Sequence, residues 1–310
     1  MTFADTSALA RAADRLVARF RRSIKRPWRK LKLRELRRAN ALSRTPVTGH
    51  DGPVVSLTSF GPRVATVFYT LETIAQGSLR PSRLILWLED ALHAQPLPDT
   101  LQRLARRGLE IRYCKDWGPH KKYFPYVMSD TPLDVALVTA DDDHLYPRDW
   151  LARLHQAHRA LPTVIHCFRA YRLRFQANGS IAPYKQWDRC ESMQPSPLNF
   201  FTGCSGVLYP PAMQQALHRR GEGFADCCPR ADDVWLNAVA TWEGIPTRQV
   251  VPLPRDFPEL PGSRQQGLAR SNVDSGGNDV QLAATFRSED WAWLHAQTQS
   301  ATARSRPEPA

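Results

Sequence analysis

Three consecutive carboxylates, Asp141, Asp142 and Asp143, follow directly after the mostly apolar run 133–140. We refer to them as the acidic cluster. A buried strand that ends in clustered carboxylates can hold a hard divalent cation, because Mg²⁺ and Mn²⁺ prefer oxygen ligands and use few protein carboxylates alongside substrate phosphates. Three adjacent like charges also repel one another unless a cation is present. The cluster therefore predicts a metal site for a phosphate-bearing substrate.

A second acidic pair, Asp232 and Asp233, stands at the start of a predicted helix that opens with residues 232–236. An aspartate at a helix start can cap free backbone amides, so capping is an alternative interpretation for Asp232. For the acidic cluster the corresponding alternative is one capping aspartate and two solvated ones. A glycine-rich loop, 203–206, permits close backbone approach to a ligand. Its alternative is an ordinary turn.

Short apolar runs alternate with helical patterns from Val54 onward, which predicts an α/β fold with a mostly parallel sheet flanked by helices. We expect strands over 54–59, 83–88, 109–113, 133–140, 163–168 and 171–176, and helices over 64–76, 99–107, 150–160 and from 232. Ligands of open α/β sheets bind beyond the carboxyl ends of the strands. The acidic cluster falls at such an end.

The net charge of +12 is concentrated near the N-terminus, where residues 1–40 carry thirteen Lys/Arg against three acidic residues. Apolar residues recur there at helical spacing until Pro27, which predicts a basic amphipathic helix within residues 8–38. Three interpretations stay open: attachment to an anionic membrane, a helix packed on the main domain, and nucleic-acid binding, which we do not expect because the accompanying features are missing.

The chain of 310 residues suits one catalytic domain with appendages. We expect a basic N-terminal segment over 1–50, a catalytic domain over 51–262, and a C-terminal helical extension over 263–310 that ends in a disordered tail from about residue 301. The six cysteines are scattered without metal-binding or disulfide spacing, which indicates reduced thiols. With no signal peptide or membrane-spanning window, we expect a cytoplasmic protein, soluble or peripheral at the inner face of the plasma membrane.

The ordered set of blocks resembles glycosyltransferases of the GT-A fold, in particular bacterial enzymes that build surface polysaccharides. The resemblance covers roughly residues 53–285 and is carried by residues 55–60, 84–88, 139–143, 203–209 and 232–236. It implies a GT-A-like, Rossmann-type sheet. It also implies that Asp141 and Asp143 bind Mn²⁺ or Mg²⁺, which bridges the diphosphate of a nucleotide-sugar, with Asp142 able to replace either.

The same resemblance implies roles for other residues. Asp233, with Asp232 beside it, matches the position of a general base that activates an acceptor hydroxyl. The expected donor-binding residues are Thr58, Glu89, Asp90, Lys121, Lys122 and Asp142. The expected acceptor or sugar loop comprises Gly203, Ser205 and Gly206. A solvated charged loop is the alternative for residues 120–122.

The implied activity is metal-dependent transfer of a sugar from a nucleoside-diphosphate sugar to a glycan or lipid-linked acceptor. Two alternatives are a catalytically inactive sugar- or nucleotide-binding module and a metal-dependent nucleotidyltransferase. A further metal ligand is expected from His295, from residues 278–279, or from water. The donor base, the sugar, the acceptor and the stereochemical outcome stay open.

Overall fold

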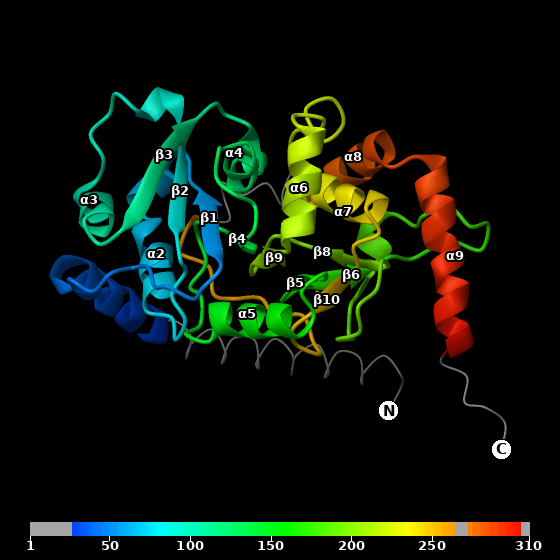
Figure 1. Cartoon of the computed structure of the whole chain (residues 1–310), viewed down its shortest axis with the longest axis horizontal. Coiled ribbons are helices and arrows are strands. Elements are labelled where there is room, and N and C mark those ends of the chain that lie inside the picture. The colour runs from blue at the N-terminus through cyan, green and yellow to red at the C-terminus, as the bar shows by residue number, and fades with distance from the viewer. Residues whose placement is uncertain (1–26, 264–271, 274, 305–310) are drawn as a thin grey trace, which may run out of the picture. The chain divides into compact units, whose positions relative to one another are not determined.

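The computed structural model describes residues 27–263, 272–273 and 275–304 (Figure 1). The chain divides into two units between Arg44 and Thr45. In the first unit, residues 27–42 form a helix on which Trp28 and Leu31 are exposed. Most of the predicted amphipathic helix, up to residue 26, lies outside the described residues.

Seven of the described strands form one mixed sheet in the second unit (Figure 1). In sheet order they are β10 (Thr247–Gln249), β5 (Ile165–Cys167), β9 (Val207–Tyr209), β4 (Leu137–Ala140), β1 (Val54–Thr58), β2 (Leu84–Glu89) and β3 (Leu109–Cys114). Every pairing is parallel except those of β9, which runs antiparallel to β4 and β5. The predicted α/β fold with a mostly parallel sheet is confirmed.

The register brings alternate residues to opposite faces of this sheet, and both faces are buried. Val54 pairs with Leu137, and Leu137 pairs with Tyr209, so these three side chains share one face, where they join the main hydrophobic cluster. Leu57 and Val138 belong to the other face and are also fully buried. Strands buried on both faces read as continuous apolar runs, which is why they can be recognised in the sequence.

Helices cover both faces of the sheet (Figure 1). In chain order the described helices of the second unit include η1 (Gly61–Ala65), α2 (Phe68–Ala75), η2 (Asp90–Leu92), α3 (Asp99–Ala105), η3 (Gly118–Lys122), α4 (Phe124–Val127), α5 (Trp150–Ala160), η4 (Tyr184–Gln186), α6 (Pro211–Arg220), α7 (Asp232–Trp242), α8 (Gly277–Thr285) and α9 (Ser288–Arg304). Helix α6 packs beside α4, and α7 packs beside α8, while α5 lies along β5 and β9.

A smaller antiparallel sheet is inserted in the chain between β5 and β9, with β6 (Ala170–Arg172) between β7 (Asp188–Arg189) and β8 (Asn199–Phe201). Helix α9 continues through Arg304, beyond the residue at which we expect disorder to begin. No helix in the described part of the chain is long and apolar enough to cross a membrane. All six cysteines lie within the described residues, and none of them forms a disulfide there.

Candidate active site at the carboxyl edge of the sheet

The acidic cluster lies just beyond β4, and each of its side chains faces a basic partner. Asp141 Oδ1 lies 2.6 Å from Lys122 Nζ. Arg63 donates to both other carboxylates, through Nη1 to Asp142 Oδ1 at 2.6 Å and through Nη2 to Asp143 Oδ2 at 3.0 Å. Because all three carboxylates form ion pairs, the alternative of a capping aspartate with two solvated neighbours is wrong.

Asp142 has the most enclosed carboxylate of the cluster, with only 5% of the residue exposed. Ser59 Oγ donates to its Oδ2 at 2.6 Å, and Thr70 Oγ1 donates to its backbone carbonyl at 2.9 Å. Burial raises the pKa of Asp142, and the charge of Arg63 acts against that rise. Asp142 therefore ties the ends of β1 and β4 to α2, and this surrounded position offers little access to a donor nucleotide.

Asp141 and Asp143 have ionised carboxylates at neutral pH. Burial acts to raise the pKa of Asp141, but the charges of Lys122 and His144 outweigh it and lower the pKa. For Asp143, burial is likewise outweighed by the hydrogen bond and charge of His144 and by the charge of Arg63, which bring its pKa down to about 2. Two carboxylates of the cluster are thus fixed as anions by neighbouring cations.

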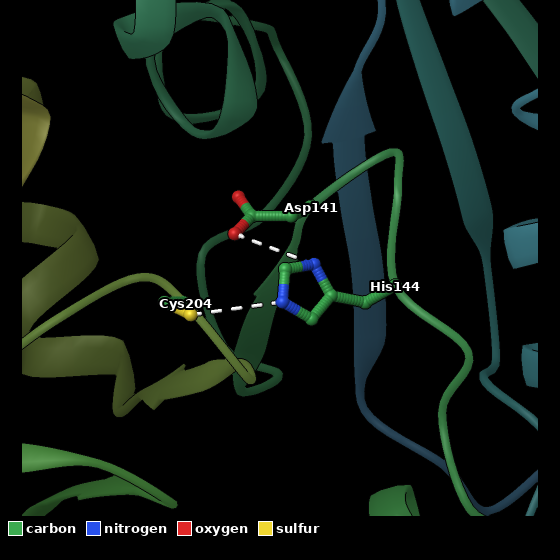
Figure 2. A group of neighbouring side chains, drawn as sticks. All are labelled: Asp141, His144 and Cys204. Carbon is green, nitrogen blue, oxygen red and sulfur yellow. Dashed lines mark hydrogen bonds and ion pairs between the residues drawn. The ribbon is translucent and has the colours of Figure 1, made fainter. Parts of the chain in front are cut away.

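His144 connects the acidic cluster to the glycine-rich loop (Figure 2). Its Nδ1 lies 2.8 Å from Asp143 Oδ1 and 3.9 Å from Asp141 Oδ2, and its Nε2 lies 3.6 Å from Cys204 Sγ. Burial lowers the pKa of His144, but the bonds to Asp143 and Cys204 and the charge of Asp141 raise it to about 11. Donor atoms of Asp141, His144 and Cys204 all lie within 4.8 Å of one another.

The loop 203–206 between β8 and β9 has a fixed backbone. Ser205 has a backbone φ of +76°, a conformation that residues other than glycine rarely adopt, and Gly206 has a φ of +95°. Two hydrogen bonds hold Ser205: its Oγ donates to the Arg255 carbonyl at 2.7 Å, and its carbonyl accepts from Trp150 Nε1 at 2.8 Å. A Cβ at position 206 would lie 2.5 Å from the Trp150 ring. The loop is therefore more constrained than the ordinary turn of the alternative interpretation.

Asp232 and Asp233 open α7 opposite this loop. Asp232 makes no capping hydrogen bond, so that alternative is wrong; its Oδ2 lies 3.4 Å from Lys122 Nζ. The backbone N–H of Gly203 donates to Asp233 Oδ1 at 2.7 Å. Burial, followed by the charge of Asp232, raises the pKa of Asp233 to about 7. A carboxylate with such a pKa can accept a proton near neutral pH.

Asn237, one turn into α7, fixes the start of this helix against β8. Its Oδ1 accepts from the Phe201 N–H at 3.1 Å, and its Nδ2 donates to the Phe201 carbonyl at 2.9 Å. The same Nδ2 donates to the backbone carbonyl of Asp233 at 2.7 Å. A side-chain amide thereby bonds both backbone groups of a buried strand residue, so the position of Asp233 is linked to the sheet.

Charge at this edge is unbalanced. The described side chains here include five carboxylates, on Asp141, Asp142, Asp143, Asp232 and Asp233, and three basic groups, on Arg63, Lys122 and His144. Burial is the main cause of the raised pKa of Asp233, and the negative charge of Asp232 adds to it. A bound divalent cation would offset that excess, and the carboxylate, imidazole and thiol near Asp141 are chemically suitable ligands. The site therefore fits a divalent metal.

The adjacent lysines of η3 serve different groups of carboxylates. Lys121 Nζ lies 2.8 Å from Glu89 Oε1 and 2.5 Å from Asp116 Oδ1, and its side chain is almost fully buried. Lys122 instead reaches the acidic cluster. The alternative of a solvated loop over residues 120–122 is wrong, because the first two are buried. Glu89 and Lys121 form an ion pair with each other that does not include Asp141. Their role in donor binding stays a prediction.

Thr58 and Asp90 lie where their strands end, as expected. The Thr58 hydroxyl donates to the Trp87 carbonyl at 3.0 Å and is buried. Asp90 opens η2 directly after β2 and is exposed. Their roles in donor binding stay predictions.

The candidates for a further metal ligand near the C-terminus are occupied elsewhere. The His295 ring packs on Phe175, with centroids 5.0 Å apart, and Asp279 Oδ1 accepts from the Tyr184 N–H at 2.7 Å. His144 is instead the histidine beside Asp141. It directly follows the acidic cluster in the sequence, which was a usable signal. Arg63, in η1, and Cys204, in the loop 203–206, had no such signal.

No protein-family model and no curated protein sequence matches the chain. Its structure is similar to that of the mannosyltransferase PcManGT from Pyrobaculum calidifontis in complex with GDP-Man and Mn²⁺, with 16% identity, a TM-score of 0.42, and coverage of 90% of this chain and 84% of that chain. It is also similar to CMP:2-keto-3-deoxy-manno-octonic acid synthetase complexed with CTP, with 10% identity, a TM-score of 0.38, and coverage of 72% of this chain and 98% of that chain. Similarities at these scores carry no argument about activity, which depends on the geometry of the site itself.

Proposed function

We propose that this chain is a metal-dependent glycosyltransferase that moves a sugar from a nucleoside-diphosphate sugar to a hydroxyl of a glycan or lipid-linked acceptor. One observation carries the proposal. Lys122 lies within ion-pair distance of both Asp141 and Asp232, so a carboxylate suited to metal binding and the acidic pair suited to base catalysis share one site. Glycosyl transfer from a diphosphate donor needs these two functions side by side.

The donor side of the proposed site is centred on Asp141. A divalent ion such as Mn²⁺ or Mg²⁺ would neutralise charge on the departing diphosphate, which is the chemistry that a metal supplies there. Asp141 is ionised, half-buried and close to two further potential ligands. Lys122 keeps a positive charge beside it, since burial lowers its pKa but the charges of Asp141 and neighbouring carboxylates raise it well above its ordinary value.

The acceptor side is centred on Asp233. Its carboxylate takes the proton of the acceptor hydroxyl while the hydroxyl oxygen bonds to the anomeric carbon and the bond from that carbon to the diphosphate breaks. A single displacement of this kind inverts the configuration of the sugar. The Gly203 N–H orients Asp233 Oδ1. A Cβ at position 203 would lie 3.1 Å from Asp233 Oδ1, so glycine allows the loop backbone to approach this carboxylate closely.

The N-terminal segment supports an acceptor at a membrane surface. Within the described residues, the helix over 27–42 is rich in Lys and Arg and exposes Trp28 and Leu31. Basic charge combined with exposed aromatic and aliphatic side chains favours the interface of an anionic membrane. We therefore propose peripheral attachment at the cytoplasmic face through residues 8–38, and a role in surface-polysaccharide synthesis.

The direct test is a donor-consumption assay with metal, in which UDP-, GDP- and CDP-sugars are each offered with candidate glycan and lipid-linked acceptors. Release of the nucleoside diphosphate together with a glycosylated acceptor is the expected result. Nucleotidyl transfer would instead consume a nucleoside triphosphate and release pyrophosphate, and that outcome would replace the proposal. Nucleotide binding without turnover, in protein shown to be folded, would indicate a binding module.

A further inference from the structure

The side chains around His144 are arranged as a site for a transition metal. Zinc bonds of about 2.0–2.3 Å at tetrahedral angles separate neighbouring ligand atoms by about 3.3–3.8 Å. The 3.6 Å between His144 Nε2 and Cys204 Sγ agrees with that spacing. Asp141 Oδ2 lies 3.9 Å from His144 Nδ1, and one ligand atom from each of Asp141, His144 and Cys204 lies within 4.8 Å of the other two. Three ligands from two segments already converge, and substrate or water can take the fourth position.

Asp143 lies where a carboxylate can orient a metal-bound histidine by accepting a hydrogen bond from its other ring nitrogen. Its Oδ1 lies 2.8 Å from His144 Nδ1, which leaves Nε2 as the nitrogen that faces Cys204. Metal-binding histidines commonly donate their other ring N–H to a carboxylate, which fixes the ring and its tautomer. The other oxygen of Asp143 is held by Arg63 at 3.0 Å. Asp143 is therefore placed to support the site through His144.

Cys204 has a basic neighbour in addition to His144. Arg169, the residue before β6, donates through Nη1 to Cys204 Sγ at 3.3 Å and also pairs with Asp256. The backbone of the next residue, Ser205, is left-handed, and two hydrogen bonds hold that residue. The thiol therefore lies in a segment that contacts hold from several sides.

We infer that Asp141, His144 and Cys204 form a metal centre with oxygen, nitrogen and sulfur ligands, selective for an ion of zinc's class such as Zn²⁺ or Co²⁺ over Mg²⁺, with Asp143 as a positioning residue. Thiolate and imidazole ligands suit such ions, whereas Mg²⁺ requires oxygen ligands. Binding replaces whatever protons Nε2 and Sγ carry and releases them to solvent. The inference rests on the proposed function only for the role of the metal in sugar transfer. Metal binding by these three residues needs neither the sugar donor nor the acceptor.

The test uses Co²⁺ as a spectroscopic probe of the full-length protein, stripped with chelator and kept reduced. A thiolate bound to Co²⁺ produces a near-ultraviolet charge-transfer band. We expect this band to saturate at one equivalent and to persist in a large excess of Mg²⁺. It should disappear in Cys204→Ser and remain in the matched control Cys227→Ser, which removes another half-buried thiol.

A second variant tests the positioning role. Asp143→Asn should weaken Co²⁺ binding by about 10–100-fold while the charge-transfer band survives at saturation, as is typical when the partner of a metal-bound histidine is lost. Asp141→Asn removes a ligand and should also weaken binding. Circular dichroism and thermal melts confirm that each variant is folded.

Two results would overturn the inference. One is the absence of the charge-transfer band in the wild-type protein, which would mean that His144 and Cys204 are in contact without binding a metal. The other is a band that persists in Cys204→Ser. Either result would leave the proposed transferase activity with its oxygen-bound metal intact. Conversely, a Cys204-dependent band in a protein without turnover would reject the transferase and keep the metal centre.

Discussion

Lys122 Nζ and Asp141 Oδ1 lie 2.6 Å apart and join helix η3 to the end of strand β4. The ion pair is half-buried, and Asp232 lies on its other side. Its neighbour Lys121 faces Glu89 and Asp116 instead. Two consecutive lysines thus provide a variant and a matched control at the same place in the fold.

Lys122→Met should shift the pH dependence of turnover upward. The charge of Lys122 lowers the pKa of Asp233, which burial and Asp232 raise to about 7. Removing that charge lets the pKa rise by roughly one unit or more, a typical effect of one nearby charge. Lys121→Met should leave the midpoint unchanged. Measured pH–rate profiles check this, and equal midpoints in both variants would contradict the role of Lys122.

Asp233→Asn should lower turnover by about 10²–10⁴-fold, because loss of a general base commonly costs that much. Binding of the donor nucleotide should be nearly unchanged, since Asp233 lies on the acceptor side. Steady-state rates and donor affinity measured on the same preparation provide the check. Asp149→Asn, which alters an exposed Asp149–Arg153 pair, is the control. Turnover close to wild type would exclude Asp233 as the base.

The Asp233→Asn variant, which should lower turnover, should also raise the melting temperature of the protein at neutral and higher pH. A carboxyl whose pKa is raised on folding, here from an ordinary 3.8 to about 7, favours the folded state at low pH, and this contribution is lost as pH rises through about 7. Asp233→Asn cannot ionise, so it should raise the melting temperature relative to wild type above pH 7 more than at pH 5. Thermal melts of both proteins across pH 5–9 provide the check. If folding did not change the pKa of Asp233, the two melting temperatures would differ by the same amount at every pH.

The centre of the sheet was predictable because strands β1, β2 and β4 are buried on both faces and read as apolar runs, so the position of the acidic cluster at the edge beyond β4 followed from the sequence. Which basic side chain would pair with each carboxylate of the cluster was not predictable from the sequence. Nothing in the sequence indicates that Arg63 would bind Asp142 and Asp143, because that pairing spans about eighty positions and depends on how η1 packs. Likewise, nothing in the sequence indicates that Cys204 Sγ would lie 3.6 Å from His144 Nε2, sixty positions away.

The basic N-terminal segment should bind anionic vesicles. The double variant Trp28→Ala with Leu31→Ala removes exposed apolar side chains and keeps the charge, so binding should weaken, and deletion of residues 1–40 should abolish it. Vesicle sedimentation with phosphatidylserine, compared with phosphatidylcholine, measures both effects. Undiminished binding by the deletion variant would refute attachment through this segment.

The most direct measurement for the central claim is calorimetric binding of UDP, GDP and CDP, each with divalent metal and again with chelator, to wild type and Asp141→Asn. We predict that one nucleotide binds with metal, that chelator abolishes its binding, and that the variant loses it while remaining folded. Binding that is indifferent to chelator and to Asp141, or no binding of any nucleotide to folded protein, would contradict the proposal of a metal-dependent nucleotide-sugar transferase.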